Sequence, residues 1–321
     1  MLATLLTILL LLLAGCFRED AAAGEEPREE QPFIAVVARG FEHEFWRTVR
    51  QGSLAAAGEL AIPLSFDGPA TEEMVDVQID FLQNAVTRKA DAILLAALDS
   101  TAMVAPVEQA QAAGIPVATF DAGVETEVLF HVGTDNRAGG VLAAKHLGEL
   151  IGGAGEVAVI LHDRESETGI ERWIGFSEGM QELYPGVEII SPVVGRGNPE
   201  RSARLLREVL EEYPRLVGVF AANEGSAVGA ARVVGERGGE LKLVGFDASQ
   251  AELELLREGV IDGLVAQDPF SMGYQGVRTL YRYLQGEAVP EVTRTAVTYI
   301  TAENLQDPAV QEVLAPGVPE E

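Results

Sequence analysis

Two aspartates of this sequence stand in matching surroundings. Asp121 and Asp247 each lie in a Phe-Asp-Ala triplet, and each follows a short apolar run, IPVATF before Asp121 and LKLVGF before Asp247. Two carboxylates can act as acid and base in glycoside hydrolysis, or they can accept hydrogen bonds from the hydroxyls of a bound ligand. The repeat singles out neither aspartate as an acid of raised pKa, which favours binding.

Other arrangements that could carry chemistry have little support. The segment Gly175-Phe176-Ser177-Glu178-Gly179 fits the pattern GxSxG, but a nucleophile elbow needs a strand directly before the serine, and GIERWI is typical of a helix. No phosphate-binding GxxxxGK[ST] or GxGxxG occurs. The histidines show no metal-binding spacing, so we expect neither a metal nor a cofactor; they are His43, His131, His146 and His162.

The elements that position the aspartates alternate between strand and helix. From Phe33 onwards, apolar runs of strand length alternate with helical patterns, and the series restarts after a linking strand near 128–133. Such a βαβ series predicts parallel sheets covered by helices on both faces. The helices are expected at 46–60, 71–88, 100–113, 135–151, 169–183, 198–212 and from 224.

The two series are an internal repeat. DAILLAALDSTA, residues 91–102, has the organisation of LVGVFAANEGSA, residues 216–227, and each is followed by a Phe-Asp-Ala segment. In open α/β sheets, ligands bind beyond the carboxyl ends of the strands. Asp99 and Asn223 share this position with the two aspartates, so the polar residues of facing halves would converge on one cleft.

Length and charge limit the possible functions. The 321 residues suffice for two domains, and 47% are hydrophobic, as in compact globular proteins. The formal net charge of -27 repels phosphate, which argues against a nucleic-acid partner.

The beginning of the chain has the features of an export signal. Residues 1–16 form an apolar run that is too short to span a bilayer and ends in Leu13-Ala14-Gly15-Cys16, which resembles the lipobox of bacterial lipoproteins. Cys16, the only cysteine, is therefore the expected lipidation site, and an intramolecular disulfide is excluded. The acidic, aperiodic residues 17–32 predict a flexible tether.

Several longer segments together resemble the type I periplasmic binding proteins of the ribose-binding group. They are IAVVARGFEHEFWRTVRQG, AGIPVATFD, VGTDNRAGG, GVFAANEGSAVGA, LVGFDAS and VAQDPFSMGYQGV. The resemblance implies an α/β fold of two Rossmann-like lobes with parallel-sheet cores, joined by a three-stranded hinge. It implies an N-terminal lobe of 33–134 plus 267–296, a C-terminal lobe of 135–266 plus 297–303, and a tail of 304–321.

The resemblance also implies a set of ligand contacts. Phe45 and Trp46 would form an aromatic wall for a sugar, and the other positions would bond its hydroxyls. In ribose binders an arginine stands at the position of Ala122, and the family places an aromatic near 195–198, where this chain has none. We therefore expect a monosaccharide or polyol other than ribose. The implied contacts are His43, Phe45, Trp46, Asp121, Arg172, Asn223, Asp247 and Gln267.

Structural roles are open for some of these residues. Strand-end Asp and Asn often cap the following helix, which is the role expected of Asp135 and Asn136 and an alternative for Asn223. Arg172 could instead pair with an acid on its own helix.

The expected function is that of a lipid-anchored receptor outside the cytoplasm, a monomer that delivers a sugar or polyol to an ABC permease and its ATPase. The alternative is a sensory receptor that reports the bound ligand to a chemoreceptor or kinase. A repressor would need a basic helix-turn-helix before the core, where this chain has a signal segment and an acidic tether. A hydrolase would use Asp121 and Asp247 for turnover. Because the sequence singles out neither aspartate as the acid, we expect no enzymatic activity.

Overall fold

The computed structural model describes residues 31–314 apart from 191, 239 and 296. The helices and strands of the described part all belong to the unit formed by residues 32–321. The predicted signal segment with Cys16, and the tether up to residue 30, lie outside the described residues. Among the helices of the described part, none is long and apolar enough to cross a membrane.

The first sheet, which defines the N-lobe, has the strand order β12-β5-β4-β3-β1-β2, and every pair is parallel. Its central strands are fully buried runs such as IAVV and AILL, as expected for a sheet covered on both faces. The strands are β1 (Ile34–Val37), β2 (Leu64–Asp67), β3 (Ala92–Leu95), β4 (Val117–Phe120), β5 (His131–Thr134) and β12 (Val292–Thr295).

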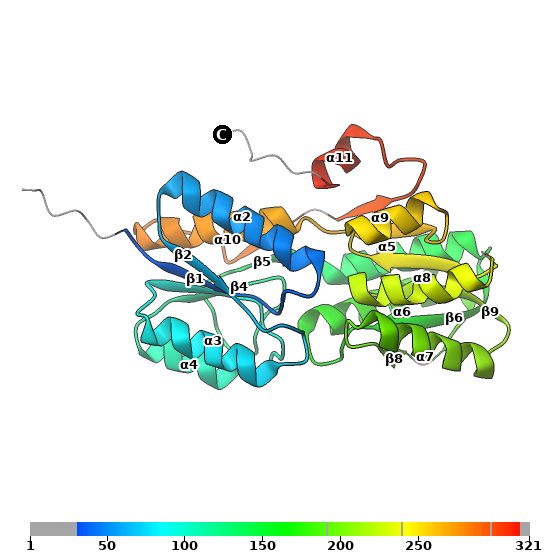
Figure 1. Cartoon of the computed structure of the whole chain (residues 1–321), viewed down its shortest axis with the longest axis horizontal. Coiled ribbons are helices and arrows are strands. Elements are labelled where there is room, and N and C mark those ends of the chain that lie inside the picture. Colours follow the sequence, from blue (N-terminus) through cyan, green and yellow to red (C-terminus); the bar gives the residue numbers. More distant parts are fainter. Residues whose placement is uncertain (1–30, 191, 239, 296, 315–321) are drawn as a thin grey trace, which may run out of the picture. The chain divides into compact units, whose positions relative to one another are not determined.

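Helices cover both faces of this sheet, as Figure 1 shows. Helices α2 (Glu44–Leu60) and α10 (Pro269–Leu284) pack on one face, and α3 (Val75–Thr87) and α4 (Val104–Ala112) on the other. Helix α4 begins later than the predicted 100, because the Asp99 carboxylate accepts hydrogen bonds from the amides of Thr101 and Ala102 and holds a turn there.

The second sheet, which defines the C-lobe, has the order β13-β11-β10-β9-β6-β7, with β8 also beside β6. The predicted single strand VEIISPVV is two strands, β7 and β8, and Pro192 between them cannot donate to a ladder. The strands are β6 (Ala154–Leu161), β7 (Gly186–Ile189), β8 (Val193–Val194), β9 (Leu216–Ala221), β10 (Lys242–Phe246), β11 (Gly263–Ala266) and β13 (Thr298–Ile300).

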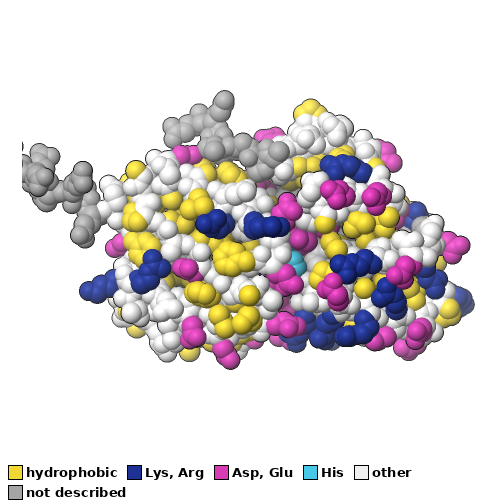
Figure 2. All heavy atoms as spheres, in the orientation of Figure 1, with side chains coloured by type: hydrophobic (Ala, Val, Ile, Leu, Met, Phe, Trp, Pro, Cys, Tyr) yellow, Lys and Arg dark blue, Asp and Glu magenta, His cyan; other side chains and the backbone are white. Residues whose placement is uncertain are grey.

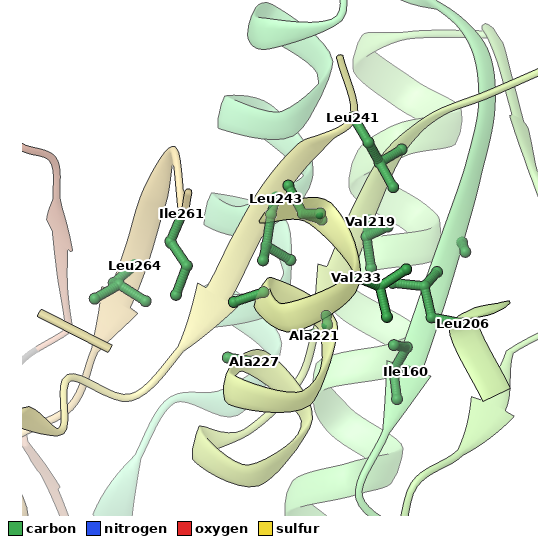
Figure 3. Close-up of a cluster of buried hydrophobic side chains, with 14 of the residues drawn as sticks. Ile160, Leu206, Val219, Ala221, Ala227, Val233, Leu241, Leu243, Ile261 and Leu264 are labelled. Atoms are coloured by element: carbon green, nitrogen blue, oxygen red, sulfur yellow. The ribbon is translucent and has the colours of Figure 1, made fainter. Parts of the chain in front are cut away.

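Helices also cover both faces of the C-lobe sheet. Helices α5 (Asn136–Leu150) and α6 (Glu167–Leu183) pack on one face. The opposite core, shown in Figure 3, packs Ile160, Val219 and Leu243 of the sheet against helix residues such as Leu206 and Val233. Its helices are α7 (Pro199–Glu212), α8 (Glu224–Glu236), α9 (Gln250–Arg257) and α11 (Pro308–Leu314), the last lying within the segment predicted as a tail.

The chain passes between the lobes three times in the described part. It crosses from β5 to α5, returns from β11 to α10, and crosses again from β12 to β13, which pairs antiparallel with β11. The predicted fold, two α/β lobes joined by a three-stranded hinge, is therefore confirmed.

The GxSxG segment lies inside α6, as predicted, and the structure explains its glycines. A methyl group on Gly175 would overlap the carbonyl oxygen of Arg137 on α5, and one on Gly140 of α5 would overlap the carbonyl oxygen of Arg172. The two helices thus cross backbone to backbone. Ser177 donates to the carbonyl of Ile174 within the same helix.

This crossing yields a stability prediction. We expect Gly175→Ala to lower the free energy of unfolding by about 1–3 kcal/mol, because the added methyl must push two packed helices apart. Ser177→Ala is the matched control and should change it by less than ~0.5 kcal/mol. Urea unfolding monitored by circular dichroism measures both, and equal effects would contradict the packing role.

Candidate functional site

A cavity between the lobes is bordered by the carboxyl ends of strands from both sheets. It measures about 310 Å³, including the part open to solvent, and all eight residues implied by the family resemblance line it. Four further residues that the sequence analysis missed line it as well. The twelve are Arg39, His43, Phe45, Trp46, Glu72, Asp121, His162, Thr168, Arg172, Asn223, Asp247 and Gln267.

Asp121 and Asp247 follow β4 and β10 at equivalent turns of the two lobes. Both have left-handed backbone conformations, with φ of 55° and 86°, which non-glycine residues rarely adopt. Backbone strain of this kind concentrates at binding and catalytic sites. The internal repeat therefore extends to backbone geometry.

The two carboxylates are nevertheless used differently. Asp247 accepts hydrogen bonds from the Gln267 side-chain amide at 2.6 Å and from the Glu224 backbone amide at 2.9 Å. No described residue donates to the Asp121 carboxylate, which is buried and faces the cavity. Asp121 is thus the carboxylate left for a ligand.

Burial raises the pKa of Asp121 from 3.8 to about 7, against the opposing charges of Arg39 and Arg172. Glu72 and Asp247 add to the rise. The expectation that neither aspartate stands out as an acid was wrong, because burial and neighbouring charges are set by the tertiary structure.

Arg172 projects from α6 and is fixed on three sides. Its Nε donates to Asn136 Oδ1 at 2.9 Å, its Nη1 donates to the Ala222 carbonyl at 2.7 Å, and its guanidinium lies 3.8 Å from the ring centroid of Phe246. Within the described part of the chain, the expected alternative, a pair with an acid of its own helix, is not formed. Among the described residues Nη2 has no hydrogen-bond partner, and Arg172 lines the cavity, so Nη2 is available to a ligand there.

The expected capping role is correct for Asp135 and Asn223 and wrong for Asn136. Asp135 caps α5 by accepting from the Ala138 amide. Its neighbour Asn136 is buried and orients Arg172, a role that the sequence did not indicate. Asn223 caps α8 through Oδ1 and also lines the cavity.

The aromatic residues at the start of α2 differ in exposure. Trp46 is almost fully buried, donates from Nε1 to Glu72 Oε1 at 2.8 Å, and makes edge contacts with Phe45 and Phe120. Phe45 is half-buried and lines the cavity. Trp46 is thus held by packing and by its bond to Glu72, and Phe45 has the more exposed ring of the two.

Two histidines of the cavity keep an unpaired ring nitrogen among the described residues. His43 Nε2 and His162 Nδ1 are buried without a hydrogen-bond partner, whereas His162 Nε2 lies 3.0 Å from Thr168 Oγ1. Burial lowers the pKa of His162 to about 4, so its ring is neutral at pH 7 and can bond a hydroxyl. The described residues contain no cluster able to hold a metal ion.

A charged network that forms part of the cavity lining connects the lobes. Arg39 of the N-lobe donates to Glu72 at 3.3 Å and, across the lobes, to Asp163 at 2.8 Å and Thr168 at 3.0 Å. Burial would raise the pKa of Glu72, but Arg39 holds it below its usual value.

Only two of the four missed residues could have been found from their position in the sequence. Arg39 and His162 follow predicted strands and could have been found by the strand-end argument. Glu72 lay hidden in a helix predicted from 71, whereas α3 begins at Val75. Thr168 lies in the first turn of α6 and carries no sequence signal of its own.

Comparisons with known proteins agree with the fold of two α/β lobes. Residues 34–288 match the family described as periplasmic binding protein domain. The D-ribose/D-allose-binding protein of Pseudomonas aeruginosa is 29% identical over 299 residues, which cover 88% of this chain and 92% of the relative.

Two solved structures extend the likeness to three dimensions. An ABC transporter solute binding protein from Agrobacterium vitis, bound with alpha-D-tagatopyranose, has a TM-score of 0.84 and 31% identity over 88% of this chain and 99% of that one. A carbohydrate transporter solute binding protein from Agrobacterium radiobacter, in complex with D-arabinose, has a TM-score of 0.86 and 28% identity over 89% and 99%.

Proposed function

Because this chain belongs to the periplasmic binding protein family, we propose that it captures a neutral monosaccharide or polyol between its lobes and delivers it to an ABC permease and its ATPase. The observation that carries the proposal is the interlobe cavity, whose lining combines unused donors and acceptors from both lobes. Relatives and structural neighbours that bind ribose, allose, tagatose and arabinose support it.

The unused groups fit hydroxyls better than a charged ligand. In the described part of the chain, Gln267 Oε1 and the Asp121 carboxyl have no donor, and Arg39 Nε has no acceptor. Each hydroxyl both donates and accepts, so a polyhydroxylated ligand can satisfy all of them. Two guanidiniums and several carboxylates already balance one another around the cavity, so the site has no large excess charge to offer an ionic ligand.

Ala122 argues against ribose as the ligand. This residue is fully buried next to Asp121, at the position where ribose binders have an arginine. A methyl group cannot replace the hydrogen bonds of a guanidinium, so we propose a sugar or polyol other than ribose.

The setting outside the cytoplasm rests on the sequence. We propose export, with lipidation of Cys16 in the Leu13–Cys16 motif and an acidic tether at 17–32. We assign 33–134 with 267–296 to the N-terminal lobe, and 135–266 with 297–303 to the C-terminal lobe. We expect the receptor to act as a monomer and without enzymatic turnover.

A thermal-shift panel of pentoses, hexoses and polyols tests the proposal. A ligand that binds only the folded state at 100 times its Kd stabilises the protein by about 2.7 kcal/mol, or roughly 5–10 °C for a chain of this size. We expect at least one sugar or polyol to do so. Sugar acids, amino acids and nucleosides serve as controls, and a shift with one of these but with no sugar or polyol would refute the assignment.

A further inference from the structure

The start of helix α2 lacks a local side-chain cap and is instead capped by the opposite lobe. His43, its N-cap residue, makes no side-chain capping bond. The carboxylate of Glu224, the first residue of α8 in the C-lobe, accepts from the amides of Glu44 at 2.8 Å and Phe45 at 3.4 Å. Orphan amides at a helix start favour a carboxylate, so this contact satisfies α2 only while the lobes meet.

The reverse contact is made next to it. Glu44, the first residue of α2, accepts with Oε2 from the amide of Gln250 at 3.1 Å, and Gln250 begins α9 in the C-lobe. Ser249 and Glu252 form the capping box of α9, in which each side chain accepts from the backbone amide of the other residue, and the Gln250 amide between them donates to Glu44. Each lobe thus supplies a glutamate to a helix start of the other.

Both glutamates lie beside the ligand cavity rather than in its lining. They border an adjacent cavity that shares Phe45, Asp247 and Gln267 with it. The Glu224 amide bonds Asp247, and Glu224 Oε1 lies 3.9 Å from His43 Nδ1. Figure 2 shows acidic side chains gathered where the two lobes meet, with a histidine among them.

We propose that Glu44 and Glu224 form a reciprocal latch that stabilises the closed arrangement of the lobes and thereby sets ligand affinity without contacting the ligand. The inference rests on the proposed function, in which the ligand lies between the lobes. A receptor whose binding-competent state is less populated has a proportionally weaker apparent affinity. Opening would return both helix starts to water. Glu44 and Glu224 are therefore positioning residues.

The test uses Glu44→Ala, Glu224→Ala and the double variant, with Asp76→Ala as control. Asp76 is an exposed acid in the first turn of α3, which packs on α4 and β1 within the N-lobe. Small-angle scattering reports the opening of the lobes, and calorimetry gives the Kd for the sugar or polyol found by thermal shift. We expect each latch variant to weaken binding about 5- to 10-fold, the double variant by about the product, and Asp76→Ala to leave it unchanged.

The scattering measurement tests the latch independently of the proposed function. Without ligand, the latch variants should have a larger radius of gyration than the wild type, and saturating ligand should abolish the difference. An unchanged radius and Kd would overturn the latch, as would lower thermal stability with unchanged Kd, which indicates local capping only. Failure of every sugar and polyol to bind the wild type would refute the proposed function, while the radius without ligand would still test the latch.

Discussion

Asp121→Asn should make the protein progressively more stable than the wild type as pH rises from 4 to 8, while weakening ligand binding. The pKa of Asp121 is raised by burial from 3.8 to about 7. A carboxyl whose pKa is raised on folding stabilises the protein while protonated, and this contribution is lost as pH rises through the folded-state value. The shift corresponds to at most ~4 kcal/mol. Asparagine cannot ionise, and it tolerates the positive φ at this position.

The measurement is the free energy of unfolding from urea denaturation at several pH values without ligand. The difference between Asp121→Asn and wild type should increase between pH 4 and 8, with most of the change complete near pH 7. Asp80→Asn removes an exposed carboxyl of α3 and is the matched control. A difference for Asp121→Asn that stays flat over this pH range would show that its carboxyl is not held in its neutral form.

At pH 8, above the Asp121 pKa of about 7, the same substitution should reduce affinity, because an amide offers one acceptor oxygen and no charge in place of the ionised carboxylate. Hydrogen bonds to charged groups contribute about 1.5–3 kcal/mol, which corresponds to roughly 10- to 150-fold in Kd. A variant that gains stability and loses binding is expected where a binding site keeps a strained, incompletely paired residue. Unchanged affinity would remove Asp121 from the ligand contacts.

Arg172→Met should abolish most ligand binding. Arg172 is buried and held by Asn136, Ala222 and Phe246, so its guanidinium, whose Nη2 has no partner among the described residues, is oriented before the ligand arrives. Loss of one charge-assisted bond lowers affinity roughly 10- to 150-fold. Arg172→Lys should be nearly as weak, because an ammonium cannot reproduce the planar fork or the contact with the Phe246 ring.

Calorimetry with the ligand from the thermal-shift panel measures these losses, and circular dichroism checks that the variants fold. Arg137→Met is the control, since Arg137 is exposed and pairs with Glu178 on the surface. It should bind as the wild type does. Wild-type affinity for Arg172→Met would mean that the guanidinium serves only to hold the helix against β9 and β10.

The sequence by itself was sufficient to predict the layered fold and much of the candidate site. Strands such as IAVV and AILL are buried on both faces, so they appear as continuous apolar runs, and the alternation with helices implies parallel sheets. Because parallel strands end at one edge, residues directly after a strand, such as Asp121, Asn223 and Asp247, could be placed at a common cleft. His43 and Arg172, which lie on or beside helices, were predicted only through the family resemblance.

The tertiary structure alone decided how these residues are used. Several contacts of the site join residues far apart in the chain, and no local periodicity encodes such pairs. They include the bond from Arg39 to Asp163, the bond from the Glu44 amide to Glu224, and the bond from Arg172 to Asn136. The raised pKa of Asp121 depends on burial between two lobes, whereas Asp247 is occupied by Gln267 and the Glu224 amide. Two aspartates with the same triplet thus acquire different roles, because burial and hydrogen-bond partners are properties of the folded chain.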